Sequence, residues 1–197
     1  DNYQGIHNNN NSATFSGLAL ETRTSGASRW LIANEWKNTY LGDLVFRNRN
    51  AALTSQESMR IDSSGRVTMP YQPAFNAIYG ANSNGTAYVI PFTAAVTNVG
   101  GHYNVSTYRF TAPVAGTYFF MHNGMSNNGY NRTAYKVNGA FVGGEFFSQN
   151  VAYANFVGSI VLTLADGDYV EVWNDIQSNS QGDMYTNYRA FSGFLIG

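Results

Sequence analysis

Two carboxylates that stand two residues apart, Asp166 and Asp168, are the strongest candidates for acid–base chemistry in this sequence. A pair of carboxylates flanking a glycosidic bond is the usual catalytic arrangement of glycosidases. The same residues, with Gly167 between them, also make an ordinary hairpin turn between two apolar strands. We favour the turn, and a carbohydrate-cleaving activity stays as a minor alternative.

The other residue types that enzymes use for catalysis are scattered. His7, His102 and His122 are isolated, without the paired spacing of a zinc site. The sequence has neither a Gly-x-Ser-x-Gly elbow for a nucleophilic serine nor a glycine-rich phosphate loop. Cysteine is absent, which excludes a thiolate nucleophile, a thiolate metal site and a disulfide framework. The sequence therefore predicts that the protein is not an enzyme.

Oxygen donors near residue 180 could hold a hard cation. Asp175 and Asp183, together with Asn174 and Asn179, are the kind of loop ligand that Ca²⁺ prefers. They do not follow the spacing of a known calcium motif, so a solvated loop is the favoured interpretation. We expect no other cofactor, and a calcium ion near Asp175 and Asp183 stays open.

Aromatic rings and side-chain amides alternate in three loop-like stretches, a combination suited to sugars. Rings stack against sugar faces, while amides pair with hydroxyls. The alternative is that asparagine serves the turns and tyrosine packs at a subunit interface, where it is enriched. The candidate ligand-binding residues are Asn127, Asn128, Tyr130, Asn150, Tyr153, Tyr185 and Asn187.

Composition narrows the class of protein further. The chain has 197 residues, of which 12% are charged and 15% aromatic, with a formal net charge of −1. Without a basic surplus, nucleic acid is an unexpected partner. No apolar run approaches the roughly 20 residues of a membrane span, so we expect no membrane insertion. A β-rich globular protein remains.

Turn residues divide the chain into short strand-like runs. The amino-acid composition changes near residues 62–76, after which the chain has fewer Lys and Arg and more Tyr and Phe residues. Residues 1–72 form one expected domain, and residues 73–197 form a second with about eight strands. Asp62-Ser63-Ser64-Gly65, Asn123-Gly124 and Asn138-Gly139 are expected turns, and Gly42-Asp43 punctuates the first domain. Residues 51–59 are the only helix candidate. The pattern predicts an all-β protein whose second domain is a two-sheet sandwich or jelly roll.

Several strands are apolar on both faces, for example residues 118–121 and 194–196. An antiparallel sandwich normally leaves one face wet and polar. A second apolar face needs a cover, and a neighbouring subunit is the simplest one. The first 70 residues also have few large apolar groups for a core of their own. The sequence therefore predicts an oligomer.

Seven positions in the second domain follow the spacing F-x5-N-x4-Y-x6-F-x5-G-x-Y-x-F, with His122 where the pattern ends in Phe or Tyr. This spacing resembles the complement C1q globular head, a relative of the tumour necrosis factor ligands. A closing segment around Gly193 and Phe194 resembles the last strand of that family. The resemblance implies a ten-stranded jelly roll, a compact homotrimer and, in some trimers, calcium near the threefold axis. The seven signature residues are Phe92, Asn98, Tyr103, Phe110, Gly116, Tyr118 and Phe120.

The phrase at residues 59–67, Met-Arg-Ile-Asp-Ser-Ser-Gly-Arg-Val, is similar to one found in bacteriophage tail fibres. That resemblance implies a trimeric β shaft segment before the C1q-like head. Together the two parts predict an extracellular receptor-binding tip of a virion tail fibre, whose partner is a host-cell surface glycan or protein. The alternatives are a purely structural trimerisation or capping module and a secreted C1q-like ligand.

Overall fold

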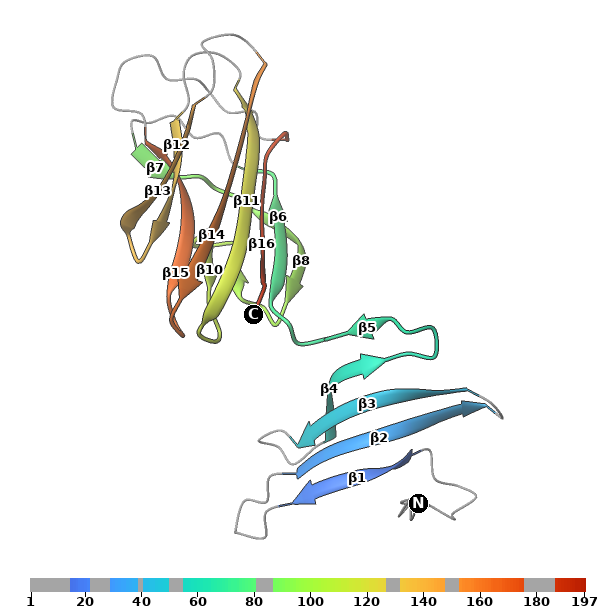
Figure 1. The fold of residues 1–197 in the computed structure, drawn as a ribbon. Helices are drawn as coiled ribbons and strands as arrows, with labels where there is room; N and C mark the ends of the chain where they lie inside the picture. Colours follow the sequence, from blue (N-terminus) through green and yellow to red (C-terminus); the bar gives the residue numbers. More distant parts are fainter. Residues whose placement is uncertain are drawn as a thin grey trace. The chain divides into compact units, whose positions relative to one another are not determined.

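The computed structural model describes residues 15–21, 29–38, 41–49, 55–80, 87–126, 132–147, 153–175 and 187–197. The chain divides into two compact units, an N-terminal unit (Asp1–Tyr71) and a head unit (Gln72–Gly197) (Figure 1). Every regular element in the described ranges is a β-strand, which confirms the all-β prediction. The only helix candidate, residues 51–59, is not a helix in its described part, which belongs to a strand. None of these elements is a helix with the length and hydrophobicity to span a bilayer.

The N-terminal unit is one antiparallel sheet in which each strand pairs with the next along the chain. The turn between its last two strands is the one that the sequence predicted. The Asp62 carboxylate accepts hydrogen bonds from the backbone N–H groups of Ser64 and Arg66, both at 2.9 Å. These bonds hold the pKa of Asp62 below its usual value. The strands are β1 (Phe15–Glu21), β2 (Arg29–Asn38), β3 (Leu41–Arg49), β4 (Ser55–Ile61) and β5 (Val67–Thr68).

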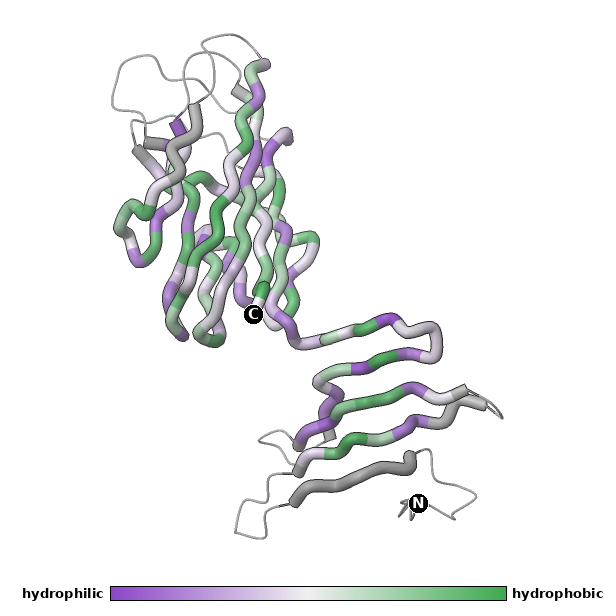
Figure 2. The backbone as a smooth tube through the Cα atoms, viewed as in Figure 1, coloured by the Kyte–Doolittle hydropathy of each residue, from purple (hydrophilic) through white to green (hydrophobic). Residues whose placement is uncertain are grey.

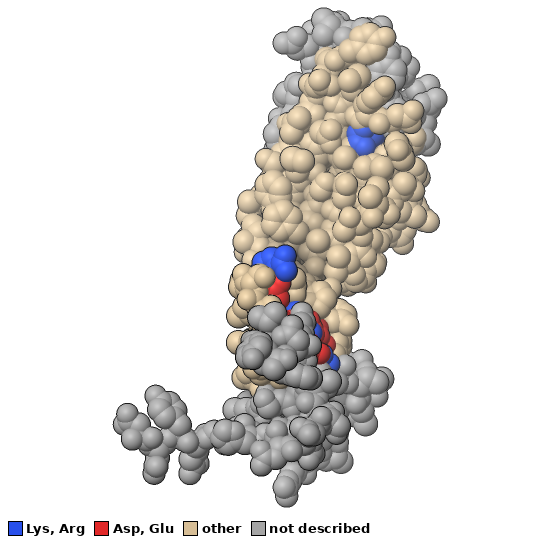
Figure 3. All heavy atoms as spheres, turned by 90° about the vertical axis from the view of Figure 1, so that its right-hand side faces the viewer, with Lys and Arg blue, Asp and Glu red and all other residues tan. Residues whose placement is uncertain are grey.

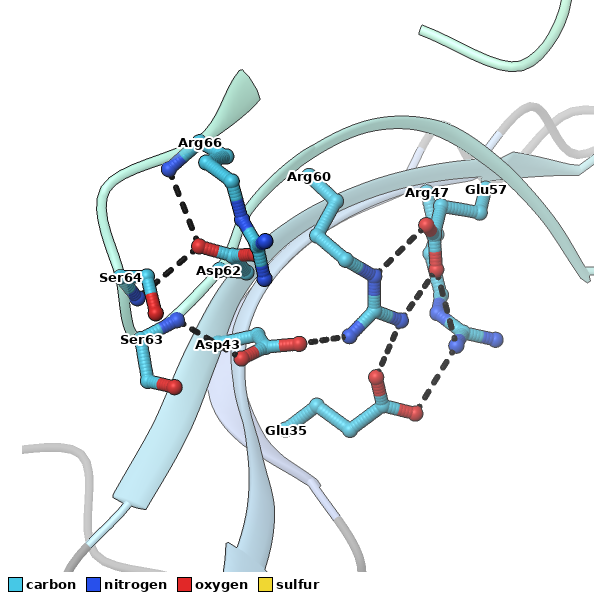
Figure 4. A network of polar contacts seen from close by, with 9 residues as sticks. All are labelled: Glu35, Asp43, Arg47, Glu57, Arg60, Asp62, Ser63, Ser64 and Arg66. Atoms are coloured by element: carbon cyan, nitrogen blue, oxygen red, sulfur yellow. Dashed lines mark hydrogen bonds and ion pairs between the residues drawn. The ribbon is translucent and has the colours of Figure 1, made fainter. Parts of the chain in front are cut away.

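One face of this sheet buries a charged network (Figure 4). Asp43 on β3 is fully buried and forms an ion pair with Arg60 on β4. Arg60 also pairs with Glu35 on β2 and holds Glu57 through two bonds of 2.8 Å and 2.6 Å. Arg47 bridges Glu35 at 3.2 Å and Glu57 at 3.5 Å. The expected turn at Gly42-Asp43 is therefore wrong, because a strand with a buried, paired carboxylate occupies that position.

The head unit is a jelly roll of two antiparallel sheets, as predicted (Figure 1). The first sheet has the order β14-β11-β16-β6-β8, and the second has the order β13-β12-β15-β10-β9, with β7 added beside β15. The described residues of the head unit form eleven strands, whereas the resemblance implied ten. The bounds are β6 (Ala74–Ile78), β7 (Ala87–Val89), β8 (Ala94–Val99), β9 (Tyr103–Asn104), β10 (Arg109–Thr111), β11 (Gly116–Ser126), β12 (Arg132–Val137), β13 (Ala140–Phe147), β14 (Ala154–Leu164), β15 (Tyr169–Asp175) and β16 (Ala190–Leu195).

Aromatic side chains fill the space between the two sheets. Phe75 stacks on Tyr103 and on Phe110 at ring-centroid distances of 5.0 Å and meets Phe191 edge-on at 4.8 Å. Five of the signature residues belong to this core. These five are Phe92, Tyr103, Phe110, Tyr118 and Phe120. Hydrophobic and hydrophilic residues follow one another along the strands of the head unit (Figure 2), as expected where inward and outward positions alternate.

The remaining signature positions serve the backbone or the surface. The Asn98 side chain donates to the Tyr103 carbonyl at 2.8 Å and accepts from its N–H at 3.0 Å, which holds the β8–β9 connection. A Cβ at Gly116 would lie 2.8 Å from Leu195, and one at Gly193 would lie 2.5 Å from the Phe120 ring. Phe194 lies outside the core, with 47% of its surface exposed, because it alternates with the buried Gly193 along β16.

Glycine has different roles at two of the expected turns. Asn138 and Gly139, with φ angles of 51° and 82°, make the predicted tight turn between β12 and β13. Asn123-Gly124 is not a turn but lies inside β11. A Cβ on Gly124 would collide with the Phe156 ring of the neighbouring β14, so this glycine makes room for the ring.

Candidate functional site

The outer face of the β14-β11-β16 part of the first sheet is apolar and exposed. Along β11, Tyr118 and Phe120 point into the core, so Phe119 and Met121 face outward. Exposed outward residues on the neighbouring strands extend the same surface. We call the whole set the apolar outer face: Phe119, Met121, Val157, Val161, Phe194 and Ile196.

Register makes one row of this face continuous across three strands. Phe119 is paired with Val161 on β14 and with Phe194 on β16. The rings of Phe119 and Phe194 lie 5.4 Å apart. Val161 is 56% exposed and Val157 is 61% exposed. Figure 3 shows few charged side chains on the visible side of the head unit. Contiguous exposed apolar surface of this kind is typical of a site that binds another protein.

Two of the predicted ligand-binding residues are described, and both are exposed. Tyr153 is 65% exposed, has a φ of 63° and directly precedes β14. Asn187 precedes β16. Because β14 and β16 both pair with the C-terminal part of β11, the two residues lie at the same end of this sheet. Five others lie outside the described residues: Asn127, Asn128, Tyr130, Asn150 and Tyr185.

The structure does not bring the calcium candidates together within the part of the chain that it describes. Asp175 ends β15, and Asn174 is buried with its Nδ2 donating to the Tyr88 hydroxyl at 3.0 Å. Asp183 and Asn179 lie outside the described residues. Among the described side chains, no group of three or more His, Asp or Glu could hold a metal ion. Calcium stays a prediction.

The candidate carboxylate pair lies in a turn, but the expected hairpin is wrong, because this turn leads from β14 in the first sheet to β15 in the second. Asp168 accepts hydrogen bonds from Asn138 Nδ2 and from the Ala165 N–H, both at 2.7 Å, and Gly167 has a φ of 86°. Both bonds hold the pKa of Asp168 below its usual value, opposite to the rise that a general acid needs. Asp166 is exposed. This arrangement supports a structural role and no acid–base role.

His122 is a core residue. Its side chain is fully buried, its Nε2 lies 2.7 Å from the Thr133 hydroxyl, and its ring meets Tyr135 edge-on. Burial lowers the pKa of His122 from 6.5 to about 3, because the charged imidazolium cannot be solvated there. His122 therefore stays neutral inside the fold.

We expect acid to destabilise the head unit through His122. The unfolded chain takes up a proton on this side chain below about pH 6.5, whereas the folded state does so only near pH 3. Stability therefore falls as the pH is lowered through that window, by at most about 1.4 kcal/mol per pH unit. His122→Phe removes this dependence, and urea unfolding at pH 7, 5.5 and 4 measures it. Equal pH slopes for the variant and the parent protein would contradict the assignment.

Comparisons with known proteins identify the class. The model of the C1q domain family matches residues 74–196, so the chain belongs to the C1q domain family, as the signature predicted. Complement C1q tumor necrosis factor-related protein 2 of Mus musculus is 32% identical over 111 residues, which cover 54% of this chain. The match covers 37% of that curated relative, so the chain spans well under half of its length.

Solved structures agree with this fold. The globular domain of zebrafish complement 1qA protein superposes with a TM-score of 0.54 at 25% identity, over 64% of this chain and 98% of that chain. Murine APRIL has a TM-score of 0.52 at 9% identity over 64% of this chain and 99% of its own, a likeness of fold alone. C1q-type domains are ligand-binding or structural modules and not enzymes, in agreement with the arrangement of Asp166, Asp168 and His122.

Two central core aromatics lie outside the seven-position signature. Phe75 and Phe191 lie at the centre of the core, yet neither belongs to the signature that we used. Phe119 was grouped with its neighbours as part of a strand that is apolar on both faces. The alternation of residues 118–121, anchored on the two signature aromatics, was a sufficient signal to place Phe119 on the outer face.

Proposed function

We propose that this chain is an extracellular recognition protein whose head unit assembles as a homotrimer through the apolar outer face. The observation that carries the proposal is the row of Phe119, Val161 and Phe194 across three strands, in which Val161 and Phe194 are exposed and Phe119 is half-buried in the single chain. Family membership adds support, since a C1q domain is a ligand-binding or structural module. Three copies would repeat every loop at the end of the sheet and so give avidity to weak sites.

The setting in which the head works has two candidates. The relatives, which are C1q tumor necrosis factor-related proteins, favour a secreted C1q-like ligand. The phrase at residues 59–67 favours a tail-fibre tip that recognises a host-cell glycan or protein. The comparisons support the first candidate more directly, and the virion setting stays a prediction. Binding of the labelled protein to animal cell lines but not to any bacterial strain of a panel would exclude the tail fibre.

A purely structural capping role makes a different prediction for the loops. Under the recognition proposal, Tyr153→Ala weakens cell binding while the native mass stays unchanged. If the trimer forms and no cell type binds it, the structural role is the better explanation.

The assembly face is tested by a matched pair of substitutions. Val161→Asp puts a charge on the apolar outer face, and its burial against another copy would be costly. We expect light scattering to show roughly 65 kDa for the parent protein, three times 21.6 kDa, and about 22 kDa for the variant. Val142→Asp, the same change at an exposed valine of β13 in the opposite sheet, should leave the trimer intact. A monomeric parent protein, or equal dissociation in both variants, would overturn the proposal.

A further inference from the structure

A row of three charged side chains crosses the outer face of the second sheet of the head unit. On β15, Val170 and Val172 belong to the core, so Glu171 between them faces outward. Lys136 on β12 is its direct cross-strand partner. From the other side, Arg109 on β10 donates its Nε hydrogen to Glu171 Oε2 at 2.8 Å. We call Arg109, Glu171 and Lys136 the cationic row, since it carries one net positive charge.

Glu171 is the anchor of this row. It is only 1% exposed, and its second oxygen, Oε1, accepts a hydrogen bond of 2.6 Å from the indole Nε1 of Trp173. Each carboxylate oxygen thus has its own donor within the sheet. The arrangement fixes the Arg109 guanidinium and raises its pKa, so that Arg109 stays charged. Glu171 is therefore a positioning residue, and Lys136 is left without a carboxylate partner among the described side chains.

Aromatic rings hold both cations in place. The Nζ of Lys136 lies 3.2 Å from the centroid of the Trp173 ring and 4.3 Å from that of Phe141. The guanidinium carbon of Arg109 lies 4.1 Å from the centroid of the Tyr169 ring. Such cation–π contacts restrict the long side chains before any ligand arrives, which lowers the entropic cost of binding. The Arg109 side chain is 39% exposed, and its terminal Nη groups have no hydrogen-bond acceptor within the described ranges.

We propose that the cationic row binds a carboxylated polysaccharide, a polymer of uronic-acid type. The two Nη groups of Arg109 form a planar fork that matches a carboxylate. Phe141, which is 52% exposed, offers a ring face beside Lys136 for a sugar ring. The two cations rest on the rings of Tyr169 and Trp173, which are four residues and so about 13 Å apart along β15, more than one sugar ring spans. This spacing and the open sheet face favour a chain of sugars over a single one.

The attraction is local, because the whole chain carries a net charge of −1 and is not generally basic. This inference specifies which class of ligand the head unit recognises, and it therefore rests on the proposed recognition function. It lies on the sheet opposite to the apolar outer face, so that a trimer built through that face would leave it exposed.

The test measures binding of polygalacturonate to the whole protein by calorimetry. Lys136→Met keeps the aliphatic contact with Trp173 and Phe141 but removes the charge, and we expect about tenfold weaker binding. Arg109→Lys keeps a cation for Glu171 but removes the planar fork, and a similar loss is expected. Arg66→Gln, at a 78% exposed side chain of the N-terminal unit, removes the same charge as Lys136→Met and should leave binding unchanged.

Other polymers and the native mass separate the outcomes. Neutral dextran should not bind. One contrary outcome is that dextran sulfate binds more tightly than polygalacturonate, with Arg109→Lys changing the affinity for neither polymer. In that case the site recognises negative charge in general, and the carboxylate proposal is wrong. Equal losses in Lys136→Met and Arg66→Gln would also overturn it. An intact trimer without polygalacturonate binding refutes this inference alone, whereas a monomer that binds refutes the proposed assembly alone.

Discussion

The Phe110→Ala variant is expected to lose about 3–5 kcal/mol of the free energy of unfolding of the head unit. The Phe110 ring is fully buried. Its centroid lies 5.0 Å from that of Phe75, 5.5 Å from that of Phe120 and 5.6 Å from that of Tyr118. Truncation leaves a cavity that these rigid rings cannot fill, because each of them is held by other aromatic neighbours. Urea unfolding followed by tyrosine and tryptophan fluorescence measures the loss.

A matched control for this variant lies on the surface of the same unit. Phe141→Ala removes the same ring from β13, where it is 52% exposed, and should cost less than about 1 kcal/mol. Similar losses in the two variants would mean that the aromatic core does not dominate the stability of the head unit.

Arg60→Met is expected to destabilise the N-terminal unit by about 3–5 kcal/mol. Arg60 is shared by Asp43, Glu35 and Glu57, so its removal leaves the fully buried Asp43 without this cation. It also leaves three carboxylates close together, with Arg47 as the remaining cation among the side chains of this network that the structure describes. The cost arises from the uncompensated negative charge and not from lost attraction alone.

The neighbouring turn provides a control, and pH provides a second one. Arg66→Met removes an arginine that is 78% exposed and pairs with Asp62, and the change should cost under about 1 kcal/mol.

Arg60 lowers the pKa of Glu57 below 4.5, so the stabilising effect of the Arg60–Glu57 pair is present above that pH and is lost in acid. The difference between the Arg60→Met variant and the parent protein should therefore shrink below about pH 4. A difference that is independent of pH would contradict the electrostatic explanation.

Local patterns in the sequence predicted much of the head unit. The two strands on either side of Asp166-Gly167-Asp168 lie where the pattern put them, although they belong to different sheets and do not form a hairpin. These features depend on neighbours in the chain, which a periodic pattern reports directly. The resemblance of the signature to the C1q head added the fold, and the signature aromatics lie in its core.

Features that depend on contacts between distant segments were not predictable in the same way. Asn123-Gly124 has the sequence of a turn. The Phe156 ring of another strand explains why glycine is needed at position 124. Asp43 also follows a glycine, yet it is buried because register brings Arg60 beside it from β4. The cationic row joins three strands, so no local window of the sequence contains it. The sequence predicted that some strand faces are apolar and must be covered by another subunit. It did not predict which residues form the apolar outer face.

The place of β16 in the first sheet bears on the order of events during synthesis. β16 lies between β11 and β6, and the Gln72 side chain binds the Leu195 carbonyl across 123 positions of sequence. The sheet therefore stays split into two parts until Ala190–Leu195 has left the ribosome, whereas the N-terminal unit pairs only consecutive strands and can form early. Phe194 and Ile196 complete the apolar outer face at that same late stage. A nascent chain therefore cannot present the complete apolar outer face to other copies before its own jelly roll is able to fold.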